Sequence, residues 1–305
     1  MIGRRIVLAG GTGFLGQSLA KHLQNQGNEV VILTRGAAGE RAGIRYIQWD
    51  GRTLGPWVDA IEDALAIVNF TGKSVNCIYT LANKQEIINS RLDAVRVIDE
   101  ALMQVKSPPT VVVQAGSLAI FGNTTELRDE QGEHGSGFSV RVCQLWEKEF
   151  FQRQYEGVRK VMLRIGFALG PDGGALEPLM KLARRGLGGT IGSGEQMISW
   201  LHLDDLNQMF DHVIRNELAT GVYNATGPQA VTNREFMQTL RTVLNKGWSP
   251  STPSLFVRMG AYLIMRADPE LALSGRNCVP KRFQQEGFKF QHHNLEQALR
   301  HIIYA

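Results

Sequence analysis

Short runs of apolar residues alternate with longer amphipathic stretches through the first half of this chain. The run at residues 6–9 is followed by an amphipathic stretch at 17–25 and then by a second apolar run at 30–33. Runs that are apolar on both faces form the buried strands of parallel sheets, whereas apolar residues three or four apart mark one face of a helix. The pattern therefore predicts strands and helices in alternation.

The same reasoning extends along the chain. It predicts further strands at residues 45–49, 66–70, 110–114, 159–165 and 221–224, and helices at 56–64, 81–105, 141–156, 175–185, 206–215 and 233–243. Thr232 and Glu235 have the spacing of a capping box at the start of the last helix. This alternation implies an α/β fold with a Rossmann-type doubly wound parallel sheet. Ligands of such sheets bind beyond the carboxyl ends of the strands.

Three glycines, Gly10, Gly13 and Gly16, stand between the first predicted strand and the first predicted helix. In dinucleotide-binding folds such glycines permit a tight turn, a close approach of the backbone to the pyrophosphate, and close packing of helix on strand. The helix N-terminus adds free N–H groups and a partial positive charge. A glycine-rich turn without a ligand is the alternative. The placement favours a dinucleotide site that includes Gly10, Thr12, Gly13, Phe14, Leu15 and Gly16.

The residue that follows the second strand bears on which dinucleotide is bound. An NAD site usually carries Asp or Glu there for the ribose 2′-hydroxyl. This chain has Arg35 at that place, and no carboxylate stands between residues 30 and 39. A guanidinium pairs well with a 2′-phosphate, so we expect NADP(H) rather than NAD(H). The alternative is an ordinary solvated charge at the end of a strand.

Composition argues against a nucleic-acid or membrane partner. The 305 residues can bury a large core, and their net charge of +4 is spread along the chain without a basic block. The cysteines, Cys77, Cys143 and Cys278, are far apart and suit free thiols in a reducing compartment. The apolar segment at 255–265 is too short to span a bilayer and predicts a packed helix. Because the chain enters its first strand at once, we expect a cytoplasmic protein without a signal peptide.

Beyond residue 165 the regular alternation gives way to glycine-rich turns. A glycine-rich, flexible loop at residues 186–194 follows Arg184 and Arg185 directly. Cations there can grip an anionic substrate, although they equally complement a helix C-terminus. We take Arg184, Arg185 and Gly192 as candidate substrate contacts. The expected organisation is a dinucleotide-binding domain at 1–165 plus about 198–226, and a smaller substrate-binding lobe at 166–197 and 227–305.

Four segments carry a resemblance to a known family, at residues 10–16, 69–72, 117–122 and 200–205. Together they resemble an extended short-chain dehydrogenase/reductase. The segments at 164–174 and 186–194 and the tail at 273–290 further resemble its atypical branch. That branch comprises NAD(P)-dependent epimerase/dehydratase-like proteins with an uncharacterised C-terminal domain. The resemblance covers essentially the whole chain, implies the same Rossmann-type fold, and adds Asn69, Thr71 and Gly72 to the candidate cofactor contacts.

The resemblance also implies a catalytic apparatus that this chain has only in part. Active members place Ser or Thr after the fifth strand, and then Tyr and Lys spaced Y-x-x-x-K on the next helix. The ammonium lowers the pKa of the phenol, which can then exchange a proton with a substrate oxygen. Ser117 matches the serine, but Phe138 and Val142 occupy the tyrosine and lysine positions. Neither of these two side chains carries a titratable proton.

Other residues are candidates for the missing acid–base chemistry. His134 titrates near neutrality, and Lys73 comes directly after Gly72. The simpler interpretation of each is a solvated surface residue. Arg141 adjoins the lysine position but is turned about 100° away on a helix. Cys143 lacks a His or Asp partner at a readable spacing and is expected in the core.

His202, Asp204 and Asp205 have the residue types of a metal cluster. In the resemblance, however, the two aspartates hold a structural position that links the two lobes, and the histidine packs beneath the substrate lobe. We therefore expect no metal site.

Two functions from different classes remain open. The chain is either an NADP(H)-dependent oxidoreductase or epimerase with an unusual proton donor, or a non-catalytic NADP(H)-binding sensor or interaction protein. In the first case Ser117 orients the oxygen of an unidentified small-molecule substrate, and the nicotinamide takes or gives the hydride. We expect a monomer or a homodimer. The resemblance implies that helices 81–105 and 141–156 form a dimer interface, as in relatives, and the alternative is that they only pack on the sheet.

Overall fold

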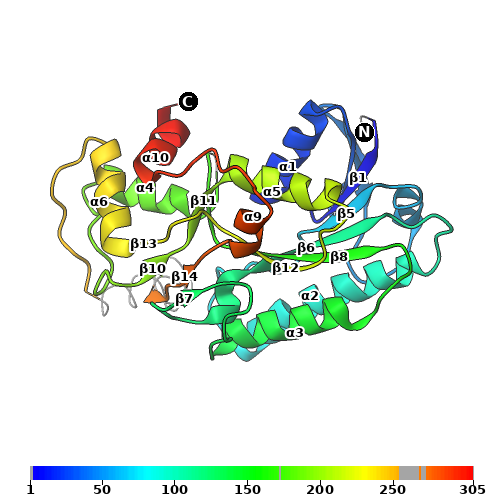
Figure 1. The fold of residues 1–305 in the computed structure, drawn as a ribbon, viewed down its shortest axis with the longest axis horizontal. Coiled ribbons are helices and arrows are strands. Elements are labelled where there is room, and N and C mark those ends of the chain that lie inside the picture. Colours follow the sequence, from blue (N-terminus) through cyan, green and yellow to red (C-terminus); the bar gives the residue numbers. More distant parts are fainter. Residues whose placement is uncertain (1–2, 172, 254–267, 269–272, 305) are drawn as a thin grey trace.

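The computed structural model describes residues 3–171, 173–253, 268 and 273–304. Its largest feature is an eight-stranded sheet with the strand order β12-β8-β6-β5-β1-β2-β4-β3 (Figure 1). All neighbours in this sheet run parallel except β3, which pairs antiparallel with β4 at the edge. The strands are β1 (Arg5–Ala9), β2 (Glu29–Thr34), β3 (Gly39–Arg41), β4 (Ile44–Gln48), β5 (Ala66–Asn69), β6 (Val111–Ser117), β8 (Arg159–Ile165) and β12 (Gly221–Ala225).

The direction in which strands are added reverses between β1 and β5. From β1 the chain proceeds outwards to β2 and β4, and from β5 it proceeds the other way through β6 and β8 to β12. The loops after β1 and β5 therefore diverge and leave a crevice, the usual ligand position in α/β sheets. Residues 10–16 follow β1 and residues 69–72 begin at the end of β5, so both segments border this crevice.

Helices cover both faces of this sheet (Figure 1), as the sequence predicts. One face carries α1 (Phe14–Asn25) and α5 (Leu203–Arg215), and the other carries α2 (Leu81–Leu102) and α3 (Phe138–Gln152). Successive side chains of a strand point to opposite faces. Ile6 and Leu8 accordingly join the core with α1 and α5, whereas Val7 and Ala9 join the core with α2 and α3. This double burial is why β1 is apolar at consecutive positions.

A smaller group of elements lies to the left of the main sheet in Figure 1. Its paired strands are β9 (Phe167–Leu169) with β11 (Trp200–His202), β10 (Met197–Ile198) with β13 (Val231–Thr232), and β14 (Asn277–Cys278) with β7 (Leu127–Arg128). Its helices are α4 (Leu176–Arg184), α6 (Asn233–Val243) and α10 (Leu295–Tyr304), whereas α9 (Lys281–Gln285) packs on β12 of the main sheet. Trp200, Phe236 and Leu299 belong to a separate core that joins α4, α6 and α10 to β9 and β11.

Some boundaries differ from the predicted ones for physical reasons. The predicted helix at 56–64 is only a short 3₁₀ helix, η1 (Pro56–Ala60). The helix predicted to begin at residue 141 begins at Phe138, because Gly137 adopts a φ of +109° at its N-cap, which favours glycine. A second 3₁₀ helix, η2 (Leu118–Phe121), follows β6 directly. The capping box of Thr232 and Glu235 is confirmed at the start of α6.

The predicted helix at 255–265 lies outside the described residues. Within the described part of the chain, no helix combines the length and the apolar character needed to cross a membrane.

Candidate functional site

The glycine-rich turn after β1 has the geometry that a phosphate site requires. Gly10 has a φ of +69°, and a Cβ atom there would come within 2.7 Å of the Thr71 hydroxyl. A Cβ on Gly16 would lie 2.5 Å from the Cα of Gly11. At Gly13, by contrast, a Cβ would meet no described atom within 4 Å. The open space in front of Gly13, at the N-terminus of α1, can therefore accept a pyrophosphate.

The side chains of the residues between these glycines differ in their exposure to solvent. Thr12 is exposed, whereas the side chains of Phe14 and Leu15 pack against the core. The Phe14 ring also supports the turn after β9, because a Cβ on Gly173 or Gly174 would come within 2.8 Å of it. Phe14 and Leu15 can thus contribute to phosphate binding through their backbone N–H groups in the first turn of α1.

The segment after β5 places a buried hydroxyl, that of Thr71, next to Gly10 of the turn after β1. Asn69 is buried, its Nδ2 donates to Oε1 of Gln114 at 2.9 Å, and its Oδ1 accepts from the Thr71 N–H at 2.9 Å. Its side chain positions Thr71. The Thr71 hydroxyl is buried without a hydrogen-bond partner among the residues that the structure describes. Such a group costs free energy until a ligand satisfies it, so Thr71 fits a nucleotide site.

Arg35 lies exposed after the end of β2, at a corner that also holds the ion pairs Lys73–Glu86 and Arg52–Asp93. The Lys73 ammonium, with smaller contributions from Arg52 and Arg35, lowers the pKa of the Glu86 carboxyl there. A cationic corner of this kind suits a 2′-phosphate. That Arg35 itself contacts the phosphate stays a prediction.

Ser117 ends β6 and caps η2. Its hydroxyl oxygen accepts the Ala119 N–H at 3.1 Å, which leaves the hydroxyl hydrogen for a ligand. Phe138 and Val142 lie in the first two turns of α3, and Val142 is only 6% exposed. The two positions therefore share one helix face, as the family spacing requires, but without the phenol and the amine.

A tyrosine that sequence reasoning missed lies beside Phe138. Tyr79 belongs to the segment between β5 and α2, and its ring meets the Phe138 ring edge-on with centroids 4.9 Å apart. The Nζ atom of Lys84, in the first turn of α2, lies 5.2 Å from the same Phe138 centroid. The Y-x-x-x-K spacing applies to two residues of one helix, the helix that follows Ser117. No local spacing could have found a tyrosine supplied by another segment.

The other acid–base candidates are engaged elsewhere. The Nε2 atom of His134 lies 3.3 Å from a guanidinium nitrogen of Arg164, and burial together with that charge lowers the pKa of His134. The Lys73 ammonium pairs with Glu86. Cys143 is buried, which raises the pKa of its thiol to about 12 and makes it unreactive.

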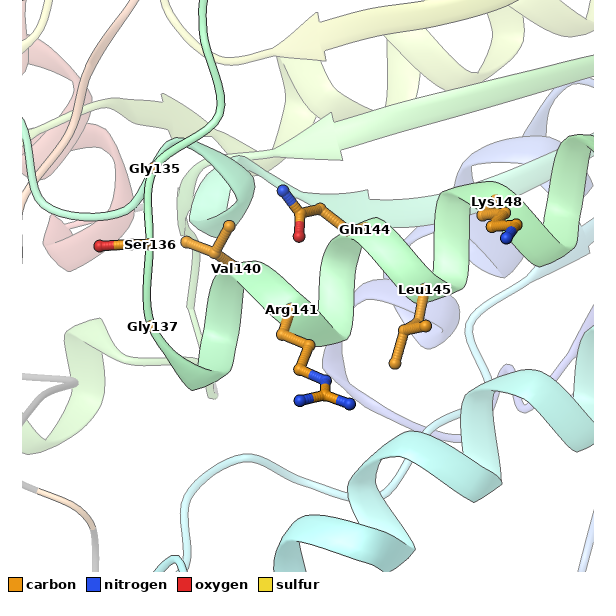
Figure 2. A pocket seen from close by; sticks show the side chains of 8 residues that line it. All are labelled: Gly135, Ser136, Gly137, Val140, Arg141, Gln144, Leu145 and Lys148. Atoms are coloured by element: carbon orange, nitrogen blue, oxygen red, sulfur yellow. The ribbon is translucent and has the colours of Figure 1, made fainter.

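Arg141 points away from the sheet, as its helical spacing predicts. It projects from the exposed side of α3 into an open cleft of about 530 Å³ (Figure 2). The cleft is lined by Gly135, Ser136, Gly137, Val140, Arg141, Gln144, Leu145 and Lys148. It faces away from Val142 and Cys143, which are buried on the other side of the helix.

The glycine-rich loop at 186–194 is held in place by α6. Arg241 donates to the Gly188 carbonyl at 2.6 Å, and the Ile191 N–H donates to Oδ1 of Asn233 at 2.9 Å. Gly192 has a φ of +60° and donates its N–H to the Thr252 carbonyl. Arg184 and Arg185 are exposed at the end of α4. Substrate contact by Arg184, Arg185 and Gly192 stays a prediction.

His202 lies in a cluster with two histidines of the tail. Its ring stacks on that of His292 with centroids 3.7 Å apart, and its Nε2 lies 3.2 Å from Nδ1 of His301. These three residues and Asp204 each offer a ligand atom, all within 4.8 Å of one another. The sequence suggested only His202 and its two aspartates, so the tail supplies histidines that the linear pattern could not connect.

One hydrogen bond determines which ring nitrogen of neutral His202 carries the proton. Its Nδ1 accepts the Asp204 N–H at 3.0 Å and thereby caps α5. With Nδ1 as acceptor, neutral His202 carries its proton on Nε2 and donates it to His301. A metal would have to displace one of these bonds, so the chemistry favours a structural cluster. Asp205 accepts the backbone N–H groups of Gln291 and His292 at 2.7 and 3.1 Å and joins the tail to α5.

Comparison with known proteins identifies the family. The model of the "NAD dependent epimerase/dehydratase family" matches residues 6–226. The chain belongs to this family. A second model, described as a "Domain of unknown function (DUF1731)", matches residues 252–302.

Curated epimerase family proteins match almost the whole of this chain. "Epimerase family protein YfhF" of Bacillus subtilis is 34% identical, and the match covers 98% of this chain and 97% of the relative. "Epimerase family protein SDR39U1" of Homo sapiens is 28% identical, with 98% and 99% covered. The resemblance to an extended short-chain dehydrogenase/reductase with a family-specific C-terminal segment is therefore confirmed.

Solved structures share the fold of this chain. Human SDR39U1 (isoform 2), crystallised with NADPH, has a TM-score of 0.87 at 28% identity and 98% coverage of both chains. MoeE5 in complex with UDP-glucose and NAD has a TM-score of 0.77 at 18% identity, with 98% of this chain and 97% of that chain covered. The expected doubly wound parallel sheet is confirmed.

Proposed function

We propose that this epimerase-family protein binds NADP(H) and acts on a small molecule as an oxidoreductase or epimerase. Two observations at the crevice between the ends of β1 and β5 carry the proposal. The space at Gly13 is open, and the Thr71 hydroxyl is buried without a partner among the described residues. A nucleotide phosphate or ribose would fill the space at Gly13 and form a hydrogen bond with the Thr71 hydroxyl. The NADPH in the human relative, which shares the fold over 98% of both chains, supports NADP(H) over NAD(H).

Different residues of this chain have different roles in that reaction. When bound, the dinucleotide supplies or accepts the hydride. The cationic corner at Arg35 holds the 2′-phosphate, and the Ser117 hydroxyl orients the substrate oxygen. We propose that residues 166–197 and 227–305 form the substrate lobe, with Arg184, Arg185 and Gly192 at its mouth. The cytoplasmic location and the monomeric or homodimeric state stay predictions.

A non-catalytic role as a sensor or interaction protein is the second candidate, and Phe138 and Val142 favour it. Titration of the purified protein with NADPH and NADH, followed by nicotinamide fluorescence and thermal shift, tests what the two candidates share. Saturable NADPH binding supports both, and turnover with carbonyl or sugar-nucleotide substrates then separates them. If neither dinucleotide binds, the proposed function is wrong.

Arg35→Asp is expected to weaken NADPH binding by about 10- to 100-fold, the value of a lost charge-assisted contact. NADH, which lacks the 2′-phosphate, should bind the variant about as well as the wild type. Arg41→Asp is the matched control, because Arg41 lies on the edge strand β3 with its guanidinium over the Tyr46 ring. Dissociation constants of both nucleotides provide the measurement. An unchanged NADPH-to-NADH ratio in Arg35→Asp would remove the 2′-phosphate role.

A further inference from the structure

We propose that Gln114 is a positioning residue of the nucleotide site, because it fixes the orientation of the Asn69 amide, which in turn holds Thr71. Gln114 is completely buried in β6 and acts through the end of the neighbouring strand β5. The proposal rests on the proposed function, since its effect is measured as the affinity for the dinucleotide.

Two hydrogen bonds join the side chain of Gln114 to Asn69, its direct partner across the two parallel strands. Nε2 of Gln114 donates to the backbone carbonyl of Asn69 at 2.9 Å and lies 3.5 Å from the Ala115 carbonyl. Oε1 of Gln114 accepts from Nδ2 of Asn69, also at 2.9 Å. Both residues are enclosed, with exposed fractions of 0% and 1%, so water does not compete for these groups.

The backbone carbonyl decides which end of each amide points where. A carbonyl oxygen only accepts, so it requires the Nε2 end of Gln114 and directs Oε1 towards the Asn69 side chain. Asn69 must then present Nδ2 to Oε1, which leaves its Oδ1 for the Thr71 N–H at 2.9 Å. A reversed Asn69 amide would set two donors against each other at Thr71. Gln114 therefore selects the one orientation in which Asn69 can hold Thr71.

The position of Thr71 affects both segments that border the crevice. Its hydroxyl is the buried group that we propose to bind the nucleotide. Its N and Cα atoms would lie 3.1 Å from a Cβ on Gly10, so the Thr71 backbone lies directly against the turn after β1. Because closely packed groups transmit small displacements, a shift of Thr71 moves the hydroxyl and withdraws support from the glycine-rich turn. Gln114 thus acts on the nucleotide site from behind the sheet edge.

Gln114→Met tests this role, because it removes both hydrogen bonds and keeps an unbranched side chain of similar length. Methionine adapts to irregular space, and a cavity of about 10 Å³ beside Asn69 and Gln114 leaves some room for the sulfur. We expect the dissociation constant for NADPH to rise by about 5- to 10-fold, the value of one lost neutral hydrogen bond. Fluorescence titration with NADPH measures it.

Asn28→Leu is the matched control for the loss of a buried amide. Asn28 is 6% exposed, and its Nδ2 donates to the Leu23 carbonyl at 2.9 Å. It directly precedes β2, at the amino end of the sheet, whereas the crevice lies at the carboxyl end. The melting temperature of this variant should therefore fall, while its affinity for NADPH should equal that of the wild type.

A double-mutant cycle with Asn69→Leu separates positioning through Asn69 from an independent effect of Gln114. Leucine has a similar shape but offers nothing for Gln114 to orient. In the Asn69→Leu background, Gln114→Met should change the NADPH affinity by less than about twofold, since the two residues act in one hydrogen-bonded unit. Losses that multiply, as for independent sites, would contradict the assignment.

Gln114→Glu keeps the proposal testable even if Gln114→Met does not fold. A neutral carboxylic acid can accept from Asn69 Nδ2 and donate to the Asn69 carbonyl, whereas a carboxylate cannot donate. Burial raises the pKa of such a carboxyl, so the affinity of this variant for NADPH, relative to the wild type, should fall between about pH 5.5 and about pH 8.5. A constant ratio over this range, or an unchanged dissociation constant in Gln114→Met, overturns the assignment. Failure of the wild type to bind NADPH instead overturns the proposed function.

Discussion

Gly13→Val is expected to weaken the affinity for NADPH by about 100-fold or more, while leaving the protein folded. Gly13 has a φ of −82° and a ψ of 177°, a β-region conformation that valine adopts readily. A Cβ there would meet no described atom within 4 Å, so a side chain can begin at this position without a clash. It would instead fill the space assigned to the pyrophosphate. Fluorescence titration measures the affinity, and the melting temperature shows whether the fold persists.

Gly16→Ala, three residues further along, is the matched control. This substitution is expected to lower the stability of the fold, whereas Gly13→Val is expected to leave it unchanged. A Cβ at Gly16 would lie 2.5 Å from the Cα of Gly11, closer than real Cβ contacts allow. The first turn of α1 would have to move away from the loop after β1, so we expect a lowered melting temperature. If Gly13→Val binds NADPH as tightly as the wild type, the glycine-rich turn is not the phosphate site.

Acidification from pH 6.5 to about 4 is expected to destabilise the fold by on the order of 3 kcal/mol through His202 and the two histidines in contact with it. Burial, assisted by the charges of His292 and His301 and opposed by Asp204, lowers the pKa of His202 from 6.5 to about 4. Above pH 6.5 the residue is neutral in both states and contributes nothing. Between the two pKa values only the unfolded chain binds the proton, so stability falls steadily as the pH falls.

His202→Asn isolates this contribution. Asparagine is a favoured N-cap and can accept the Asp204 N–H in place of Nδ1, but it does not titrate. His292, His301 and Asp204 remain in both proteins, so the difference in their stability profiles reports the titration of His202 together with its effect on these neighbours. Urea midpoints measured between pH 4 and 7 should decline less steeply for the variant. Parallel profiles would show that His202 does not titrate at a lowered pKa in the fold.

Predictions from sequence were correct where the relevant physics is local. Burial of β1 on both faces requires consecutive apolar residues, so Ile6 to Ala9 identified a central parallel strand. The glycines at 10, 13 and 16 identified a tight turn because each backbone requirement lies within one loop. Thr232 and Glu235 fixed the start of α6 by hydrogen bonds that span three residues. Periodicity, turn chemistry and capping can all be recognised in short windows.

The tertiary structure alone decided which distant side chains meet. Asn69 turned out to position Thr71 through a bond to Gln114 on the neighbouring strand. Tyr79 meets Phe138 because α2 and α3 pack on the same face of the sheet, and His202 meets His292 and His301 because the tail folds back onto α5. Such contacts depend on how whole elements pack, to which residues throughout the chain contribute. The sequence by itself therefore determined the family, the sheet and the glycine-rich turn, whereas packing determined which groups are available for chemistry.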